Sequence, residues 1–398
     1  MHPSAGICLF QCAYTFGEVF CMKKSFMLLL LAVLLFPNPV AGCEEISLSA
    51  KGAILMDAAS GRVLFSQNAD AKYPMASTTK VMTCLLAVEN CTPDEIVTAG
   101  KNAHGVPGTS IYLSEGEQLT MDEMLHGLML RSGNDAAVAI AEHISGSVSA
   151  FSELMNARAE SLGADATFIN PHGLDASGHA ASARALALIA REGLKNAWYR
   201  EIVSTKRMTI PWSTSEYNRL LVNKNKLLSS YEGAIGIKTG FTSKAGRCLV
   251  FAAEREGLTL IGVVLNDYSW FDDARRILDW GFENYACLLA AAGGNILTSV
   301  SIDGGTQKSV NLAAAENLSC AARPGEEYSI VLHAPPSVPA PVAAGQIVGT
   351  AELVINGEVL ATTDLICTDS VEKDGFLYRL SRLFHLWSAG ACMVSGGF

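Results

Sequence analysis

The segment PMASTTK (residues 74–80) runs directly into the apolar segment VMTCLL (81–86), and this junction decides the fold. If a helix opens at Ser77, Lys80 lies one turn later on the same face, and the two side-chain heads can meet. A serine hydroxyl is a weak nucleophile, but an amine whose pKa is lowered by burial can accept its proton. The junction therefore predicts Ser77 as a nucleophile with Lys80 as its base. Taken alone, it also fits Ser77 as a simple helix N-cap.

A second short motif, SGN (132–134), lies between two stretches of helical periodicity, 121–131 and 135–143. A break of this kind makes a short loop between helices. Such a loop can present the Ser132 hydroxyl and the Asn134 amide to a cleft. On its own, the motif is more often a loop with good capping residues.

A third motif, KTG (238–240), continues a β-like run at 235–239. The edge of a strand can pair with an extended peptide, and Lys238 and Thr239 can hold the carboxylate of that peptide. Gly240 would let the peptide approach the backbone closely. A lone KTG is more often a solvated turn, so the weight of this motif comes from its order after the first two.

The surrounding sequence predicts an α/β (α+β) domain. Residues 51–68 (KGAILMDAASGRVLFSQN) have the pattern of a β-hairpin, and residues from about 77 to 200 are mainly helical. Strand patterns return at 235–239, 248–253 and 258–265. Strands at both ends of a helical middle predict one antiparallel sheet that both chain ends complete and helices flank.

The pattern changes after residue 290. Short β-like runs at 299–302, 328–332 and 352–355 alternate with glycine and proline turns. This texture predicts a small all-β domain at 291–372, after a catalytic domain at 44–290.

The N-terminal residues 1–43 are interpreted as an extension followed by a signal peptide. Lys23 and Lys24 precede FMLLLLAVLLF (26–36), an apolar run too short to span a bilayer but suited to a secretory signal. The run ends in VAGC, which resembles the lipobox of bacterial lipoproteins and would place a lipid on Cys43. Ordinary signal cleavage nearby is the alternative. Either reading predicts export to the outer face of the cytoplasmic membrane or to the cell wall.

The tail, 373–398, contains an amphipathic pattern at 376–387 (FLYRLSRLFHLW). At helical spacing one face gathers Phe376, Leu380, Leu383, Phe384 and Trp387. The other face holds Arg379, Ser381, Arg382 and His385, with Leu386 among them. This arrangement predicts a helix that lies on the membrane surface. Packing of the tail against the β-domain is the alternative.

Composition excludes several classes of protein. Hydrophobic residues make up 49% of the chain and charged residues 17%, which indicates a globular protein. A formal net charge of −10 disfavours a nucleic-acid partner. The eleven cysteines show no CxxC or Cys/His spacing typical of a zinc site, and no phosphate-binding loop or Rossmann fingerprint occurs. The sequence therefore predicts neither a metal site nor a cofactor.

Taken together, the three ordered motifs resemble those of penicillin-binding proteins and class A β-lactamases, and specifically the serine D-Ala-D-Ala carboxypeptidase branch. The resemblance covers about residues 46–285. It extends to the entry hairpin at 52–68 and to NPHGL (170–174), and the segment at 341–349 resembles the C-terminal β-domain of that family. It implies a β-lactamase/transpeptidase-like fold and an acyl-enzyme mechanism. The implied partners are peptidoglycan stem peptides as substrate and β-lactams as inhibitors.

The resemblance also implies a role for each motif residue. Ser77 would be the nucleophile, Lys80 would be its base, and Ser132 would relay protons. Asn134 would contact the substrate amide, and Lys238 and Thr239 would bind the substrate carboxylate beside Gly240. The backbone N–H groups of Ser77 and Phe241 would form the oxyanion hole.

Two positions depart from the family pattern. Lys224, in KNKLL, stands where relatives often have arginine, and Phe241 stands where they often have histidine. Three other functions remain as alternatives: a peptidoglycan DD-endopeptidase, a β-lactamase, and a non-catalytic wall-binding protein. The β-lactamase is disfavoured because no ExxLN string lies between Asn134 and Lys238.

Overall fold

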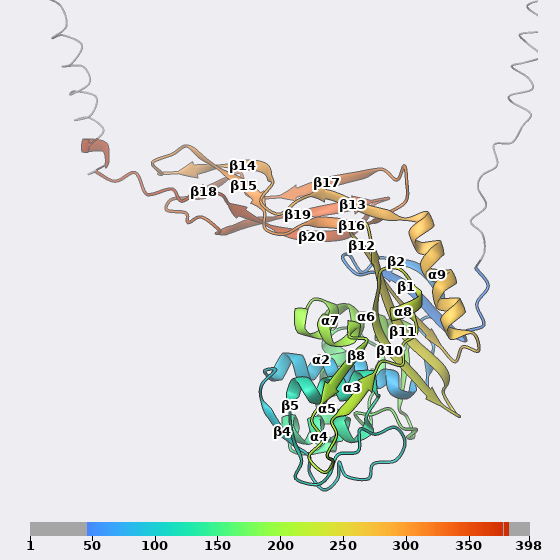
Figure 1. Cartoon of the computed structure of the whole chain (residues 1–398). Helices are drawn as coiled ribbons and strands as arrows, with labels where there is room; N and C mark the ends of the chain where they lie inside the picture. Colours follow the sequence, from blue (N-terminus) through green and yellow to red (C-terminus); the bar gives the residue numbers. More distant parts are fainter. Residues whose placement is uncertain (1–45, 377, 382–398) are drawn as a thin grey trace, which may run out of the picture. The chain divides into compact units, whose positions relative to one another are not determined.

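The computed structural model describes residues 46–376 and 378–381 (Figure 1). A five-stranded sheet lies at the centre of the first domain, in the spatial order β10-β11-β12-β1-β2, and every neighbouring pair is antiparallel. Its strands are β1 (Gly52–Asp57), β2 (Val63–Gln67), β10 (Ala234–Thr242), β11 (Gly246–Arg255) and β12 (Leu258–Leu265). The predicted antiparallel sheet, completed by both ends of the domain, is confirmed.

Helices cover both faces of this sheet. Helix α9 (Trp270–Asn284) packs on one face and α6 (Ala183–Leu194) on the other (Figure 1). Strand β1 has all six residues buried, which explains why GAILMD lacks the alternation of a half-exposed strand.

The segment between β2 and β10 is mainly helical, as predicted. Its centre is α2 (Lys80–Asn90), whose residues 80–88 are all buried, because apolar residues surround the helix on every side. The other helices are α3 (Met121–Leu130), α4 (Asn134–Ser145), α5 (Val148–Ser161), α7 (Ala197–Ser204) and α8 (Leu227–Ser230). Small strand pairs connect them: β3 (Lys72–Tyr73), β4 (Ile96–Thr98), β5 (Gln118–Thr120), β6 (Ala166–Thr167), β7 (Ala180–Ser182), β8 (Arg207–Ile210) and β9 (Arg219–Val222).

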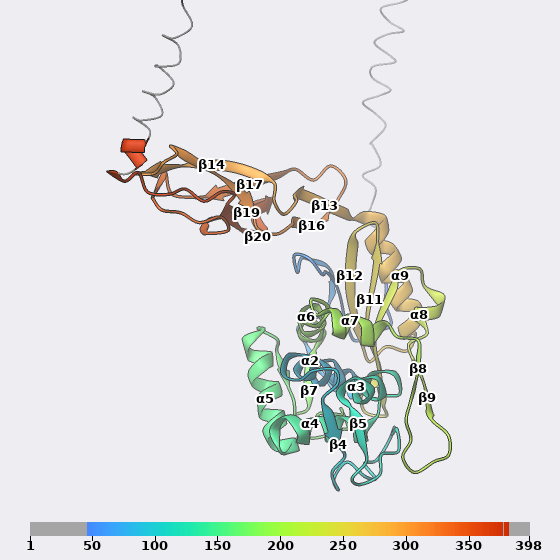
Figure 2. The same ribbon diagram turned by 60° about the vertical axis from the view of Figure 1, so that its left-hand side comes forward.

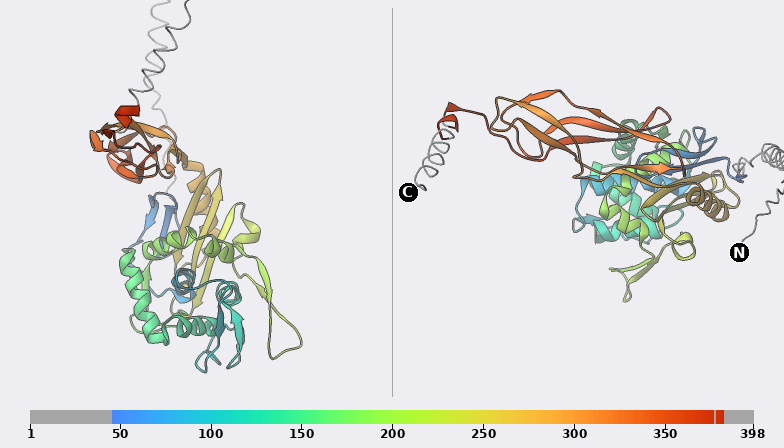
Figure 3. Two further views of the ribbon diagram at one scale, coloured as in Figure 1. Left: turned by 90° about the vertical axis from the view of Figure 1, so that its left-hand side faces the viewer. Right: turned by 90° about the horizontal axis from the view of Figure 1, so that it is seen from above.

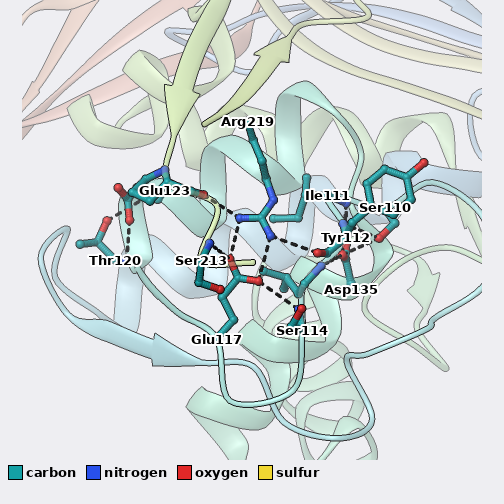
Figure 4. Close-up of polar contacts among 12 residues, drawn as sticks. Ser110, Ile111, Tyr112, Ser114, Glu117, Thr120, Glu123, Asp135, Ser213 and Arg219 are labelled. Atoms are coloured by element: carbon teal, nitrogen blue, oxygen red, sulfur yellow. Dashed lines mark hydrogen bonds and ion pairs between the residues drawn. The ribbon is translucent and has the colours of Figure 1, made fainter. Parts of the chain in front are cut away.

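Hairpin β8–β9 lies against helix α3 (Figure 2). Arg219 attaches it there through a two-pronged ion pair with Glu117, with N···O distances of 2.7 and 2.8 Å, and both side chains are buried (Figure 4). The same guanidinium donates to the backbone oxygens of Pro211 and Tyr112. Burial acts to raise the pKa of Glu117, but hydrogen bonds from Arg219 and from the Ser114 amide hold it below its usual value. The pair therefore fixes the loop before α3 to the hairpin.

The second domain is all-β, as predicted. Its six-stranded sheet has the order β17-β19-β20-β15-β14-β18, and β13 pairs with β16 beside it. Figure 3 (left) views this domain along its strands, which enclose an apolar core of their own. The strands are β13 (Ala286–Ala291), β14 (Ile296–Asp303), β15 (Ser309–Ala314), β16 (Leu318–Ala322), β17 (Tyr328–His333), β18 (Ser337–Pro339), β19 (Ile347–Ile355) and β20 (Glu358–Cys367). The predicted boundary near residue 290 falls inside β13.

The predicted signal peptide with Cys43 lies outside the described residues, as does most of the tail after residue 381. Among residues 46–376 and 378–381, no helix has both the length and the apolar character needed to cross a bilayer.

Candidate active site

Lys80 is the centre of the candidate site. Its Nζ lies 3.1 Å from Ser77 Oγ, 2.7 Å from Asn134 Oδ1 and 2.5 Å from the backbone oxygen of His172. The side chain is fully buried. Lys80 meets Ser77 as the spacing predicted, and it also contacts Asn134 of the second motif and the His172 carbonyl of the NPHGL segment.

Ser77 lies at the start of the helical segment, as the sequence predicted, and the first turn of this segment is a 3₁₀ turn, η1 (Ala76–Thr79). Helix α2 continues it from Lys80. The hydroxyls of Thr78 and Thr79 donate to the backbone oxygens of Met75 and Ala76, which tightens the turn before the helix. Lys80 still follows Ser77 by one tight turn, so the two heads meet.

The hydrogen bonds around Lys80 define what the amine can do. The amide oxygen of Asn134 and the carbonyl of His172 can only accept, so they take two N–H donors. Asn134 is oriented this way because its Nδ2 donates to the Pro107 carbonyl at 2.7 Å. A neutral amine has only two N–H groups, and its lone pair is then left for the Ser77 hydroxyl. Neutral Lys80 is therefore arranged to accept the Ser77 proton.

The surroundings favour this neutral form. Burial, the largest effect, and then the positive charges of Lys238 and Lys224 hold the pKa of Lys80 well below its usual range, and Asp135 opposes them. Burial and the charge of Lys224 also lower the pKa of Lys238 to about 7. Each buried lysine is thus poised to lose its proton more easily than an exposed one.

The SGN loop supplies two of the predicted residues. Asn134 is the first residue of α4, and its neighbour Asp135 accepts hydrogen bonds from the Ser110 hydroxyl and from the amides of Ile111 and Leu113 (Figure 4). These bonds fix the adjacent loop, which forms one wall of the site.

Ser132, in the same loop, has a positive φ of 65°, and its hydroxyl is buried without a hydrogen-bond partner among the described residues. A buried hydroxyl of this kind is expected to have a functional reason.

The KTG motif lies on β10, an edge strand of the sheet. Gly240 faces the η1 turn so closely that an added Cβ would lie 3.1 Å from the Ser77 backbone nitrogen. Lys238 is buried, and its Nζ donates to the backbone oxygen of Thr239 at 2.9 Å. Phe241 is 64% exposed. The free edge of β10 can therefore pair with an extended peptide beside Ser77.

A cavity of about 500 Å³ brings the motifs together. Five predicted residues line it: Ser77, Ser132, Thr239, Gly240 and Phe241. Lys80, Asn134 and Lys238 lie behind this wall and are buried. Sequence reasoning did not assign six further lining residues to the site: Thr109, Lys224, Lys226, Arg247, Trp270 and Phe271. Five of these six residues belong to no recognised motif. The sixth, Lys224, stands out in the sequence only as a departure from the family pattern.

The NPHGL segment forms a tight turn against the nucleophile. The Asn170 side chain accepts from the Gly173 amide at 2.7 Å and donates to the Leu174 carbonyl, which folds the turn back on itself. The turn presents the His172 carbonyl to Lys80. Gly173 has a φ of +89°, and an added Cβ would lie 1.9 Å from the Ala76 backbone oxygen. Only glycine fits there.

Gly173→Ala is therefore expected to destabilise the chain by about 3 kcal/mol or more, since it combines left-handed strain with a backbone clash. The measurement is the urea unfolding midpoint. Gly178→Ala is the matched control, because Gly178 has a similar φ of +80° with no heavy atom near the added Cβ. That variant should lose only about 1 kcal/mol. Equal losses in the two variants would mean that contact with the nucleophile turn does not matter.

Burial favours the uncharged form of the two histidines near the site. It is the main cause that lowers the pKa of His172 to about 3, and Lys80 and His179 add to it only in their protonated forms. Burial lowers the pKa of His179 to about 4, with Asp175 opposing and Lys80 assisting. His179 Nδ1 accepts from the Ile169 amide, so its Nε2 carries the proton and faces Thr79 Oγ1 at 2.8 Å. His179 thus braces the nucleophile turn.

Comparison with known proteins agrees with this geometry. The family described as D-alanyl-D-alanine carboxypeptidase matches residues 40–269, and the family described as penicillin-binding protein 5, C-terminal domain, matches residues 289–373. The chain is similar to D-alanyl-D-alanine carboxypeptidase DacF of Bacillus subtilis, with 32% identity over 92% of this chain and 99% of the relative. It is also similar to DacC of Escherichia coli, with 33% identity over 86% and 90%.

A solved structure gives the same result. Penicillin binding protein 5 from Haemophilus influenzae superposes with a TM-score of 0.68 at 29% identity, covering 82% of this chain and 99% of that one. The first family match spans more than half of the chain, and the second covers the β-domain. The chain therefore belongs to the family of serine-type D-alanyl-D-alanine carboxypeptidases.

Proposed function

We propose that this carboxypeptidase removes the terminal D-Ala of peptidoglycan pentapeptides through an acyl-enzyme on Ser77. Ser77 Oγ attacks the carbonyl carbon of the penultimate D-Ala while neutral Lys80 accepts the hydroxyl proton. The peptide C–N bond then breaks, and the departing amine takes up a proton, with Ser132 as the relay. Water hydrolyses the ester and frees Ser77. The observation that carries this proposal is the position of the Lys80 amine, which is buried, lies 3.1 Å from Ser77 Oγ and donates to the oxygens of Asn134 and His172.

The other motif residues have roles in recognition. Lys238 and Thr239 bind the substrate's terminal carboxylate, and Asn134 contacts a substrate amide. The backbone N–H groups of Ser77 and Phe241 stabilise the oxyanion, and Gly240 leaves room for the peptide beside them. A β-lactam resembles this substrate, so the enzyme should be penicillin-sensitive.

The test is release of D-Ala from a synthetic pentapeptide that ends in D-Ala-D-Ala. We expect one D-Ala and a tetrapeptide, and no release from the same peptide ending in D-Ala-L-Ala. Cleavage of a crosslinked peptide dimer without D-Ala release would instead identify an endopeptidase. Rapid turnover of penicillin would identify a β-lactamase.

The two lysines should give kcat/KM a bell-shaped dependence on pH, because kcat/KM reports the pKa values of the free enzyme. Activity rises as Lys80 loses its proton and falls as Lys238 loses its own, near pH 7. The charge of Lys224 lowers the pKa of both groups. Lys224→Met removes a neighbouring positive charge and makes protonation easier. Both limbs should therefore move to higher pH, by roughly 0.5–1 unit.

Lys226→Met is the matched control for this shift. Lys226 lines the same cavity but is not among the charges that lower the pKa of Lys238. In Lys226→Met, the acidic and alkaline limbs of the pH dependence of kcat/KM should stay at the wild-type pH values, even if the maximal rate changes. An alkaline limb at the same pH in the wild type and in Lys224→Met would contradict the coupling.

The proposal extends to location: the enzyme acts outside the cytoplasm, with its tail on the membrane surface. The family acts on the cell wall, which is consistent with export. In the described part of the tail, Phe376 is 77% exposed and Leu380 is 38% exposed. Their spacing puts them on one helical face, opposite Arg379. Exposed apolar and basic faces of this kind suit an interface with anionic lipid.

Co-sedimentation with anionic liposomes tests this placement. Protein made without Cys43 should bind when residues 376–398 are present and should lose most binding when they are removed. Equal binding by both forms would show that the tail is not the anchor.

A further inference from the structure

A cysteine, a glutamate and a histidine converge on the helical part of the first domain, away from the catalytic cavity. The donor atoms of Cys91, Glu95 and His143 all lie within 4.8 Å of one another, and each residue is partly exposed. Cys91 caps the C-terminal end of α2, Glu95 precedes β4, and His143 lies in the last turn of α4. The sequence predicted no metal site, because His143 is far in the chain from Cys91 and Glu95 and the three residues match no common ligand spacing.

The backbone holds this cluster in place. The Cys91 amide donates to the Ala87 carbonyl at 3.0 Å, which closes α2. A tight turn follows, in which the Glu95 amide donates to the Thr92 carbonyl and the Thr92 amide donates to Glu95 Oε2, each at 3.2 Å. The Met121 amide donates to the Glu95 carbonyl at 2.8 Å. These hydrogen bonds fix the backbone of Cys91 and Glu95, so that their side chains start from defined positions.

The chemistry of the three donors is that of a zinc site. His143 Nε2 lies 2.7 Å from Glu95 Oε1, and Cys91 Sγ lies within 4.8 Å of the donor atoms of both residues. Thiolate, imidazole and carboxylate are the zinc ligands of proteins, bound at about 2.0–2.3 Å, so donors this close can reach one ion after small rotations. A thiolate also excludes magnesium and calcium, which take oxygen ligands. We propose that Cys91, Glu95 and His143 bind a zinc ion, with a fourth position open to water.

Zinc takes thiolate, neutral imidazole and carboxylate as ligands, and protons compete with the metal for each of these groups. Binding at the cluster should therefore weaken as the pH falls.

The position of the site suggests what the ion does. Helix α2 begins at Lys80 and ends at Cys91, while α4 begins at Asn134 and holds His143 in its last turn. Zinc would tie together the far ends of the two helices whose near ends carry catalytic-site residues. We therefore expect zinc to stabilise the fold and to leave the reaction itself nearly unchanged.

The test uses the purified chain without a histidine tag, stripped of metal with a chelator. Zn²⁺ titration against a competing chelator should give a tight site whose affinity falls at least tenfold in Cys91→Ser and in His143→Gln. Cys287→Ser is the matched control, since Cys287 is exposed and lies outside the cluster. Zn²⁺ should raise the unfolding midpoint of the wild type and of Cys287→Ser only.

Co²⁺ gives a readout that reports the thiolate directly. The wild type and Cys287→Ser should show a sulfur-to-cobalt charge-transfer band, and Cys91→Ser should lack it. Absence of this band in the wild type, or its survival in Cys91→Ser, would overturn the proposal. Unchanged Zn²⁺ affinity in both cluster variants would also overturn it and would leave Glu95 and His143 as an ordinary ion pair.

Discussion

Ser77→Ala is expected to lower D-Ala release by about 10⁵–10⁶-fold, to the level left by binding and the oxyanion site alone. The substitution removes the Oγ that forms the bond to the substrate, and the Ser132 hydroxyl belongs to the neighbouring loop. The half-buried Ser77 side chain contributes little to packing. Release of D-Ala is measured from the pentapeptide under single-turnover conditions.

Two further measurements make the Ser77→Ala result specific. The free energy of unfolding, measured by urea denaturation, should stay within about 1 kcal/mol of the wild-type value, since one partly exposed hydrogen bond is lost. The variant should still bind the pentapeptide, because the carboxylate site is intact. Residual activity within a hundredfold of the wild type would mean that another group is the nucleophile.

Lys80→Met is expected to lower the acylation rate by about 10²–10⁴-fold, which is the range that general-base catalysis supplies. Methionine fills most of the buried space but cannot accept a proton. It also leaves the Asn134 and His172 oxygens without their donor, at a cost of about 1–3 kcal/mol of stability. The rate is measured by stopped-flow labelling with a fluorescent penicillin.

Lys80→Arg separates base catalysis from charge. A guanidinium keeps the positive charge and the hydrogen-bond donors, but it stays protonated in proteins. If Lys80 is the base, this variant should acylate as slowly as Lys80→Met. Wild-type acylation by Lys80→Arg would show that Lys80 acts through its charge, with the proton going elsewhere.

The sequence predicted the parts of the molecule that depend on short-range pattern. Hairpin β1–β2, the helical middle and strands β10–β12 follow from apolar periodicity, because each segment has one buried face or is buried throughout. The ordered motifs also placed Ser77, Lys80 and Asn134 in one site, and their contacts agree.

Features that depend on long-range packing could not be read from the sequence. The carbonyls of His172 and Pro107 are backbone atoms, so no residue type marks them as partners of Lys80 and Asn134. Trp270 and Phe271 reach the cavity from the start of α9, where the sequence resembles an ordinary amphipathic helix. The Glu117–Arg219 pair likewise joins two segments whose pairing only the fold defines (Figure 4).

The proposed zinc ligands could not be read from the sequence for the same reason. Cys91 and Glu95 are close in sequence, but His143 arrives only because α2 and α4 pack together. Motif-based reasoning finds ligands that share a short segment. It has no signal for ligands that meet at the ends of two different helices.

Peptide mapping by mass spectrometry after incubation with penicillin tests the central claim most directly. The account predicts a single penicilloyl adduct, on the peptide that contains Ser77. The adduct should persist, because the described residues that line the cavity include no glutamate to activate the deacylating water. An adduct on any other residue, or penicillin turned over many times with no adduct retained, would contradict it.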